Sequence, residues 1–190
     1  MKKKLLKGAV ILFSISAALG VAGCSSEKVQ IDSEEIDIGN VAGESVETEE
    51  ISALCPEGWT SIAVQDATAE EPDTEATNEL RFVKGGSDQE ALLTNPYINI
   101  VYYGPDQEIM QVDPNEWYDN VENLQSFTTG EYEWNGYSGT SLGVPFVYLY
   151  SETDSYTLKV WLYTREGSEL SASITDADVL AILKSIAFTE

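Results

Sequence analysis

Two segments of the chain are apolar on both of the faces that a β-strand presents. Residues 97–103 read YINIVYY, and residues 156–163 read YTLKVWLY. Successive side chains of a strand point to opposite sides of its sheet, so such segments need a covering layer on each side. They predict a central β-sheet between other layers rather than an open β-sandwich.

Five further segments have the composition of β-strands, namely residues 59–64, 80–84, 127–134, 137–142 and 146–150. Asn135-Gly136 separates two of them. This pair favours a type I′ hairpin turn, because both central positions of that turn need positive φ. Residues 152–155 predict a second, looser hairpin turn. Consecutive hairpins make the predicted sheet antiparallel.

Two amphipathic helices are predicted, over residues 113–124 and 175–186. Asp113 caps the first helix, Pro114 opens it, and Thr175 caps the second. Their apolar stripes are Trp117, Val121 and Leu124 in the first and Val179, Ile182, Leu183 and Ile186 in the second. The predicted fold class is therefore α+β, an antiparallel sheet flanked by helices in an α/β/α sandwich.

The N-terminus has the form of an export signal. Four lysines within residues 2–7 precede an apolar run over residues 8–20, which is too short for a comfortable permanent membrane span. The run ends in Val21-Ala22-Gly23-Cys24, which resembles the lipobox of bacterial lipoproteins. The resemblance implies that residues 1–23 are a cleaved signal peptide and that Cys24 is diacylated. It also implies a lipid anchor in the cell membrane, on its extracytoplasmic face.

The segment after Cys24 is rich in Ser, Glu, Asp and Gly and lacks aromatic residues up to residue 52. Such a composition buries too little apolar area to offset backbone entropy. Residues 24–52 are therefore predicted to be a disordered acidic tether. Their isoleucines and valines leave a docked strand as the alternative. Residues 53–190 are predicted to form one domain.

The chain is strongly acidic, with 33 Asp and Glu against 10 Lys and Arg, and has no histidine. Residues 1–23 hold four of the basic residues and no acidic one, so the cleaved chain carries 6 − 33 = −27 charges. This charge argues against nucleic-acid binding, which relies on Lys and Arg at phosphates. It also repels anionic lipid headgroups, so the acyl chains must supply the membrane affinity.

The sequence lacks the residues that the commonest catalytic sites need. Without histidine there is no Ser-His-Asp triad or Cys-His pair. Cys55 is the one cysteine besides Cys24, and it is expected to be a small apolar residue at the edge of the core, with Glu57 as its nearest ionisable neighbour. A non-enzymatic protein without a cofactor is predicted. A small carboxylate-based hydrolase is the alternative, because so many acids make some close pair certain.

Two features suggest a ligand. Glu70, Glu71, Asp73 and Glu75 offer oxygen atoms of the kind that bind calcium, but their loop lacks glycine and matches no calcium-loop pattern. A solvated acidic loop without a metal is therefore expected there. On the predicted hairpin, Trp134 lies opposite Tyr137, and Tyr132 shares their face. These three rings are the predicted partner-binding residues, able to stack on a sugar or anchor a protein, and the alternative is burial beneath a helix.

The order of these features resembles the PsbP-like fold, which photosystem accessory proteins, Ran-binding Mog-type proteins and many bacterial lipoproteins share. The resemblance rests on Cys55-Pro56-Glu57-Gly58-Trp59 entering the first strand and on residues 178–186 running into Phe188. It implies a non-enzymatic binding or accessory subunit of an envelope complex with a protein partner. A module that binds a solute, a glycan or a divalent cation such as calcium is the alternative.

Overall fold

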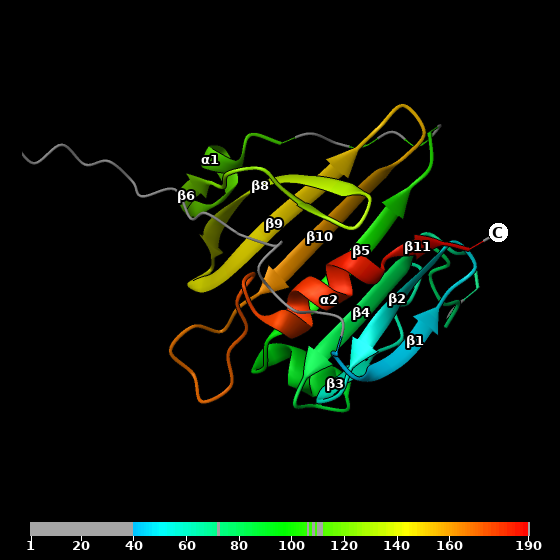
Figure 1. Cartoon of the computed structure of the whole chain (residues 1–190), viewed down its shortest axis with the longest axis horizontal. Coiled ribbons are helices and arrows are strands. Elements are labelled where there is room, and N and C mark those ends of the chain that lie inside the picture. The colour runs from blue at the N-terminus through cyan, green and yellow to red at the C-terminus, as the bar shows by residue number, and fades with distance from the viewer. Residues whose placement is uncertain (1–39, 72, 106, 108, 110–111, 190) are drawn as a thin grey trace, which may run out of the picture.

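The computed structural model describes residues 40–189, apart from residues 72, 106, 108, 110 and 111. Its largest element is an antiparallel sheet of eight strands (Figure 1). In spatial order, seven of these strands are β3 (Trp59–Ser61), β4 (Glu79–Lys84), β5 (Tyr97–Tyr103), β10 (Thr157–Tyr163), β9 (Val144–Glu152), β8 (Tyr132–Ser141) and β6 (Asp119–Asn123). The eighth, β7 (Phe127–Thr129), pairs with β8. All the pairings are antiparallel, as predicted.

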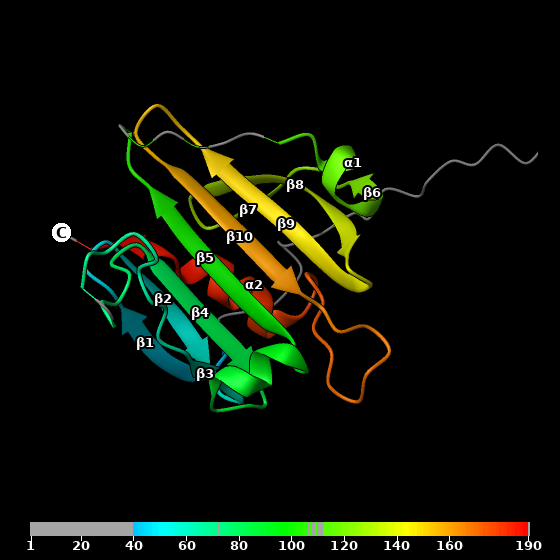
Figure 2. The same cartoon turned by 180° about the vertical axis from the view of Figure 1, so that it is seen from behind.

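A second layer lies against one face of this sheet. It contains α2 (Ala177–Ser185) and a three-stranded sheet in the order β1 (Gly43–Glu47), β2 (Ile51–Pro56) and β11 (Ala187–Phe188). Figure 1 shows α2 and β2 in front of β4 and β5, and the reverse view in Figure 2 shows them behind these strands. Two short helices complete the described elements, the 3₁₀ helix η1 (Gln89–Leu93) and α1 (Pro114–Trp117).

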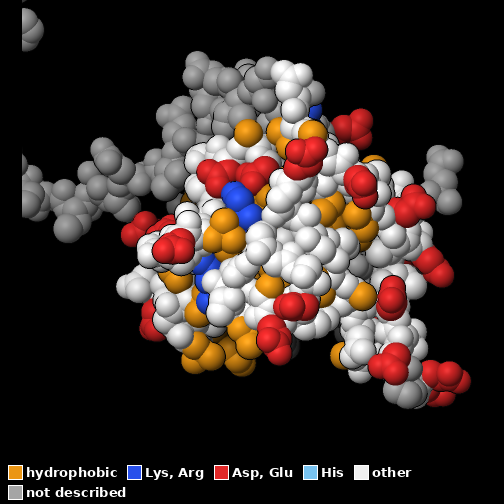
Figure 3. Space-filling view, turned by 90° about the horizontal axis from the view of Figure 1, so that it is seen from below, with side chains coloured by type: hydrophobic (Ala, Val, Ile, Leu, Met, Phe, Trp, Pro, Cys, Tyr) orange, Lys and Arg blue, Asp and Glu red, His pale blue; other side chains and the backbone are white. Residues whose placement is uncertain are grey.

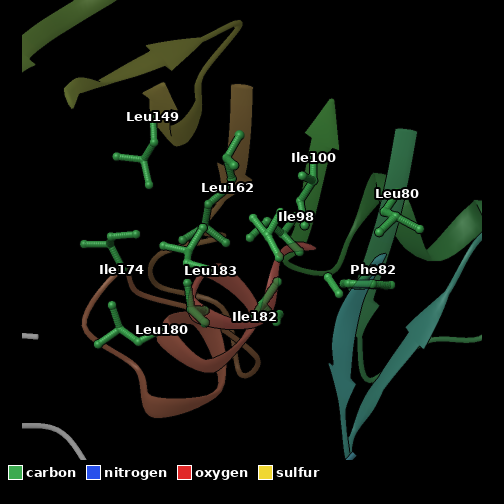
Figure 4. Packing of buried hydrophobic residues seen from close by; sticks show 14 of the residues in the cluster. Leu80, Phe82, Ile98, Ile100, Leu149, Leu162, Ile174, Leu180, Ile182 and Leu183 are labelled. Atoms are coloured by element: carbon green, nitrogen blue, oxygen red, sulfur yellow. The ribbon is translucent and has the colours of Figure 1, made fainter. Parts of the chain in front are cut away.

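The hydrophobic core fills the space between the two layers. Every second residue of β4, β5 and β10 enters it, namely Leu80, Phe82, Ile98, Ile100, Leu158, Val160 and Leu162. Figure 4 shows Ile98 and Leu162 of the sheet near Ile182 and Leu183 of α2. Because side chains alternate along a strand, the intervening residues of β4, β5 and β10 face the opposite side of the sheet.

In the described part of the chain no helix crosses the middle of that opposite side, which Figure 2 shows toward the viewer, with η1 at the ends of β4 and β5 and α1 beside β8 and β9. The predicted α/β/α sandwich is therefore wrong, and the fold is dominated by its sheet. The prediction assumed that strands with two apolar faces need cover on both. Here aromatic side chains on the second face pack against one another instead of beneath a helix.

The first predicted helix is wrong over most of its length. Its start is confirmed, because the Asp113 side chain accepts a 2.9 Å hydrogen bond from the backbone nitrogen of Asn115 and Pro114 opens the helix. The helix ends at Trp117, and residues 119–123 form β6 instead. Backbone pairing of β6 with β8 overrides the helical periodicity. Trp117 is left 67% exposed rather than in the core.

The second predicted helix is confirmed as α2, whose Val179, Ile182 and Leu183 are fully buried. It begins one residue later than predicted, with Asp176 rather than Thr175 at the N-cap. Its apolar stripe faces both the sheet and β2, so it carries much of the core.

The predicted boundary between tether and domain at residue 52 is wrong. Strand β1 pairs with β2 in a register that runs from Gly43 opposite Pro56 to Glu47 opposite Ser52. Ile51 of β2 is fully buried, which fixes this hairpin on the domain. The folded part therefore begins no later than residue 43. The predicted signal peptide (residues 1–23), Cys24 and tether residues 25–39 lie outside the described residues.

Candidate functional site

The face of the eight-stranded sheet opposite α2 carries a layer of aromatic side chains. We call this side the open face. Its aromatic residues are Tyr97 and Tyr103 of β5, Tyr137 of β8, Phe146, Tyr148 and Tyr150 of β9, Trp161 and Tyr163 of β10, and Tyr118, which follows α1. Seven of the ten tyrosines of the chain thus gather on one surface. Phe146 is buried and the other eight are partly exposed.

The rings contact one another across the strands. Tyr97 and Tyr163 stack with their centroids 4.4 Å apart and their planes 17° apart. The Tyr148 centroid lies 4.8 Å from that of Trp161 and 5.0 Å from that of Tyr137. Such pairs contribute about 0.5–1.5 kcal/mol each beyond their buried area. The layer is therefore internally packed, and it holds its rings in fixed positions.

Polar groups sit beside the rings on β4 and β5. Nε of Arg81 donates a 3.0 Å hydrogen bond to Oδ1 of Asn99, and its Nη2 lies 2.8 Å from Oε1 of Glu79. Lys159 Nζ lies over the ring of Tyr103, 5.1 Å from its centroid. Both cations are thus held at defined places among the aromatic residues.

Four phenol groups of this layer, those of Tyr97, Tyr103, Tyr137 and Tyr148, have pKa values raised chiefly by burial. Burial, then the neighbouring Tyr118, raises the pKa of Tyr137 to about 12. Burial and adjacent tyrosines likewise raise the pKa of Tyr97 and Tyr148. Burial lowers the pKa of Lys159, and the nearby Glu152 charge opposes this. At neutral pH the phenols therefore offer O–H donors and oxygen acceptors rather than charges.

The charges on the four central strands of the open face are balanced. β4, β5, β10 and β9 place two carboxylates on this face, Glu79 and Glu152, against two cations, Arg81 and Lys159. The chain as a whole has a net charge of −23. In the view from below, acidic side chains are spread over the surface and basic ones occupy only small areas (Figure 3). An aromatic surface with balanced charges in a strongly acidic protein is a candidate for recognition.

Two of the three predicted partner-binding residues lie in the core instead. Trp134 is fully buried, and its Nε1 donates a 2.7 Å hydrogen bond to Oγ1 of Thr129. Tyr132 is 6% exposed, and its hydroxyl donates to the carbonyl oxygen of Ile186 at 3.0 Å. Both face α2, whereas Tyr137 lies on the open face. The structure therefore separates Tyr137 from the other two, and its role in binding remains a prediction.

The predicted Asn135-Gly136 hairpin is wrong. β8 continues without a break from Tyr132 to Ser141, and the turn into β9 is Leu142-Gly143, with φ of 50° and 81°. Gly136 serves a close strand approach instead, because a Cβ there would lie 2.0 Å from the carbonyl oxygen of Tyr148. Trp134 and Tyr137 therefore lie three positions apart on one strand, and strand alternation places them on opposite faces.

The sequence contained a signal for the open face that its interpretation missed. Aromatic residues alternate at positions 146, 148 and 150 and again at 161 and 163. This period of two predicts a shared face. The prediction that strands 97–103 and 156–163 need a covering layer on each side overlooks this signal.

Cys55 is 8% exposed within the core, at the position predicted for it. Burial raises the pKa of its thiol, and the charge of Glu44, opposite it on β1, adds to this effect. The predicted neighbour Glu57 is not the residue responsible. A thiol with a raised pKa is a poor nucleophile at neutral pH.

The predicted acidic loop shows local bonding. Oδ1 of Asp73 accepts a 3.1 Å hydrogen bond from Nε2 of Gln65. Within the described ranges, no three His, Cys, Asp or Glu residues gather in a way that could hold a metal ion.

A shallow open hollow of about 520 Å³ lies between the end of β4 and η1. Its polar groups are engaged in local structure. The Asp88 side chain accepts a hydrogen bond from the backbone nitrogen of Ala91, and Nδ2 of Asn95 donates to the carbonyl oxygen of Lys84. The open face offers more recognition chemistry than this hollow.

Among the residues that the structure describes, no helix is long and apolar enough to cross a membrane. No protein-family model matches the chain, and no curated protein matches it. Among solved structures, LpqN, which is involved in cell envelope biogenesis of Mycobacterium tuberculosis, is 13% identical. The alignment covers 80% of this chain and 92% of LpqN, with a TM-score of 0.38. This score is too low to establish a shared fold or to say anything of function.

Proposed function

We propose that this protein is a lipoprotein anchored through Cys24 on the extracytoplasmic side of the membrane, where it serves as a non-enzymatic binding or accessory subunit of the envelope. The anchor is supported by the lysines, the apolar run and the Val-Ala-Gly-Cys motif at residues 21–24. A binding role is supported by one observation above all. Nine aromatic residues form a packed, partly exposed layer on a sheet face whose middle no described helix crosses.

This layer suits binding better than catalysis. Tyr and Trp combine large apolar area with a polar tip and few rotatable bonds, so they contact a partner at a low entropic cost. Ring stacking across strands, as between Tyr97 and Tyr163, removes freedom before any partner arrives. The chain has no histidine to activate a nucleophile, and its Cys55 thiol is buried.

The anchor is tested by replacing Cys24 with alanine and growing cells with a labelled fatty acid. The wild-type chain should take up label and fractionate with membranes, whereas the Cys24→Ala chain should stay unlabelled. Label in the Cys24→Ala chain would contradict the proposed anchor.

The binding role is tested by photo-cross-linking in intact cells. A photoreactive amino acid at Tyr150, on the open face, should join the protein to other envelope components. The matched control is the same group at Glu169, an exposed residue in the loop before α2. Equal cross-linking from both positions, or none from Tyr150, would contradict binding through the open face.

A further inference from the structure

One row of side chains crosses the open face at right angles to its strands. Trp161 of β10 lies opposite Asn99 of β5, which lies opposite Arg81 of β4. On the other side of Trp161, Tyr148 of β9 continues the row. Neighbouring strands are about 4.8 Å apart, so two aromatic rings, an amide and a guanidinium follow one another at this interval.

The polar end of the row is held in place before any ligand binds. Asn99 and Glu79 accept hydrogen bonds from Arg81 at 3.0 Å and 2.8 Å. These bonds use two of the five N–H donors of the guanidinium. Arg81 therefore presents a planar, oriented donor set in the same row as the Trp161 ring, with Asn99 between them.

This chemistry matches a sugar chain. A pyranose has apolar C–H faces that pack on aromatic rings and a rim of hydroxyl groups that donate and accept hydrogen bonds. The row supplies both kinds of partner, since Tyr148 and Trp161 offer ring surface while Asn99 and Arg81 offer directional polar groups. The neutral phenols of the layer add further groups that both donate and accept.

The charge of the protein indicates which class of ligand this surface can bind. The acidic surroundings repel anionic polymers, and Glu79 and Glu152 balance Arg81 and Lys159 on the face itself. A second copy of this chain would bring the same excess of negative charge and is disfavoured for that reason. An uncharged ligand meets neither obstacle.

We infer that the row formed by Tyr148, Trp161, Asn99 and Arg81 binds an uncharged glycan chain, with Trp161 as its stacking platform and Arg81 as its hydrogen-bond donor. This inference rests on the proposed function and names the ligand class of the open face.

The test is calorimetric titration of the full-length acylated chain, held in a polyoxyethylene detergent that has no sugar headgroup. The probes are the uncharged β-1,4 hexamers of glucose and of N-acetylglucosamine, and the anionic hexamer of galacturonic acid serves for comparison. At least one uncharged hexamer should bind saturably at up to millimolar concentration, more tightly than the anionic hexamer.

Three variants assign the binding to this row. Trp161→Ala should weaken it roughly tenfold, and Arg81→Lys, which keeps the charge but loses the planar fork, should weaken it several-fold. Trp117→Ala is the matched control, because Trp117 is an exposed tryptophan of α1 and not of the four-residue row, and it should bind like wild type. Each variant must first show a wild-type unfolding transition. If Trp161→Ala lacks a wild-type unfolding transition, the affinity of Arg81→Lys alone tests whether the row binds the glycan.

Absence of saturable binding by both uncharged hexamers would overturn the inference, as would equal or tighter binding of the anionic hexamer. Self-association of the wild-type chain that Trp161→Ala abolishes would assign the face to a second copy and would also overturn it. If neither uncharged hexamer binds but Tyr150 still cross-links in cells, the glycan inference is contradicted and the proposed binding function is retained. If neither uncharged hexamer binds and Tyr150 gives no cross-link, both the glycan inference and the proposed binding function are contradicted.

Discussion

Trp59 and Asp178 are joined by a 2.8 Å hydrogen bond from Nε1 to Oδ2, although 119 positions separate them in the chain. The same carboxylate oxygen lies 2.9 Å from Nζ of Lys84. This contact ties the first strand of the sheet to the first turn of α2. It also joins the two short motifs on which the resemblance to the PsbP-like fold rests.

Asp178→Asn should lower the free energy of unfolding by about 1–2 kcal/mol at neutral pH. Burial alone would raise the pKa of Asp178, but hydrogen bonds from Trp59 and Lys84 and the Lys84 charge outweigh burial and hold the pKa below its usual value. Its contribution is therefore present above the unfolded pKa of about 3.9 and is lost as pH falls through the lower folded pKa. Denaturant titrations at neutral and acidic pH should show the two chains converging in acid.

The control for this prediction is Asp176→Asn. Asp176 lies 3.9 Å from the same lysine and its side chain is 39% exposed, so its replacement should cost less. A loss at Asp176 equal to that at Asp178 would mean that general charge, not the Trp59 bond, accounts for the effect.

Trp134→Ala should destabilise the domain by about 3–5 kcal/mol, because the ring is fully buried and its nitrogen is bonded to Thr129. Trp117→Ala should change stability by less than about 0.5 kcal/mol, because that ring is 67% exposed. Chemical denaturation of both variants measures the difference. The reverse order would place the Trp117 ring in the core, as the helical periodicity predicted.

Leu142→Asn should stabilise the protein by about 1 kcal/mol, the cost of holding an ordinary residue in the left-handed region. Leu142 has φ of 50° in the turn between β8 and β9 and is fully exposed, so its replacement loses no buried area. Asn adopts this conformation readily and forms favoured hairpin turns before glycine. Thermal unfolding should show a raised midpoint, and an unchanged or lowered midpoint would argue against this turn.

The Tyr137 phenol of the open face should resist alkaline titration. The pKa of Tyr137 is raised to about 12 by burial and by Tyr118, against about 10 in the unfolded chain. The neutral phenol therefore stabilises the fold below about pH 10, and this contribution is lost as pH rises through about 12. Phenolate absorbance of the folded chain should lag behind that of the urea-unfolded chain, and Tyr137→Phe should reduce the lag. Superimposable curves would show that the rings are solvated.

Limited proteolysis should leave a stable core that begins at or before Gly43, not near residue 53. Strand β1 pairs with β2 along its whole length, and Ile51 is fully buried. A chain that starts at residue 48 should therefore be less stable than one that starts at residue 40. Mass spectrometry of the protected fragment locates the boundary. Equal stability of the two truncated chains would support the predicted tether over residues 24–52 and contradict the docking of β1.

The sequence by itself determined the local structure. Strand 97–103 was predicted with its observed bounds, and the Asp113 cap and the apolar stripe of α2 were correct. These features depend on neighbours within a few residues, so propensity and periodicity are sufficient to predict them. The alternation of aromatic residues at positions 146, 148 and 150 likewise predicts that these three side chains share one face of the sheet.

Tertiary structure decided the rest, because each remaining choice depended on which strands became partners. Pairing with β8 turned residues 119–123 from a predicted helix into β6, and the close approach of β9 at Gly136 kept a favoured turn pair within a strand. The first of these pairings cut the first predicted helix short at Trp117, and the second placed Trp134 and Tyr137 on opposite faces of one strand. On the open face, rings from residues far apart in the sequence cover one another's apolar surface, as Tyr97 and Tyr163 do, which are 66 positions apart. A local sequence pattern cannot show such contacts, so it predicted a covering helix instead.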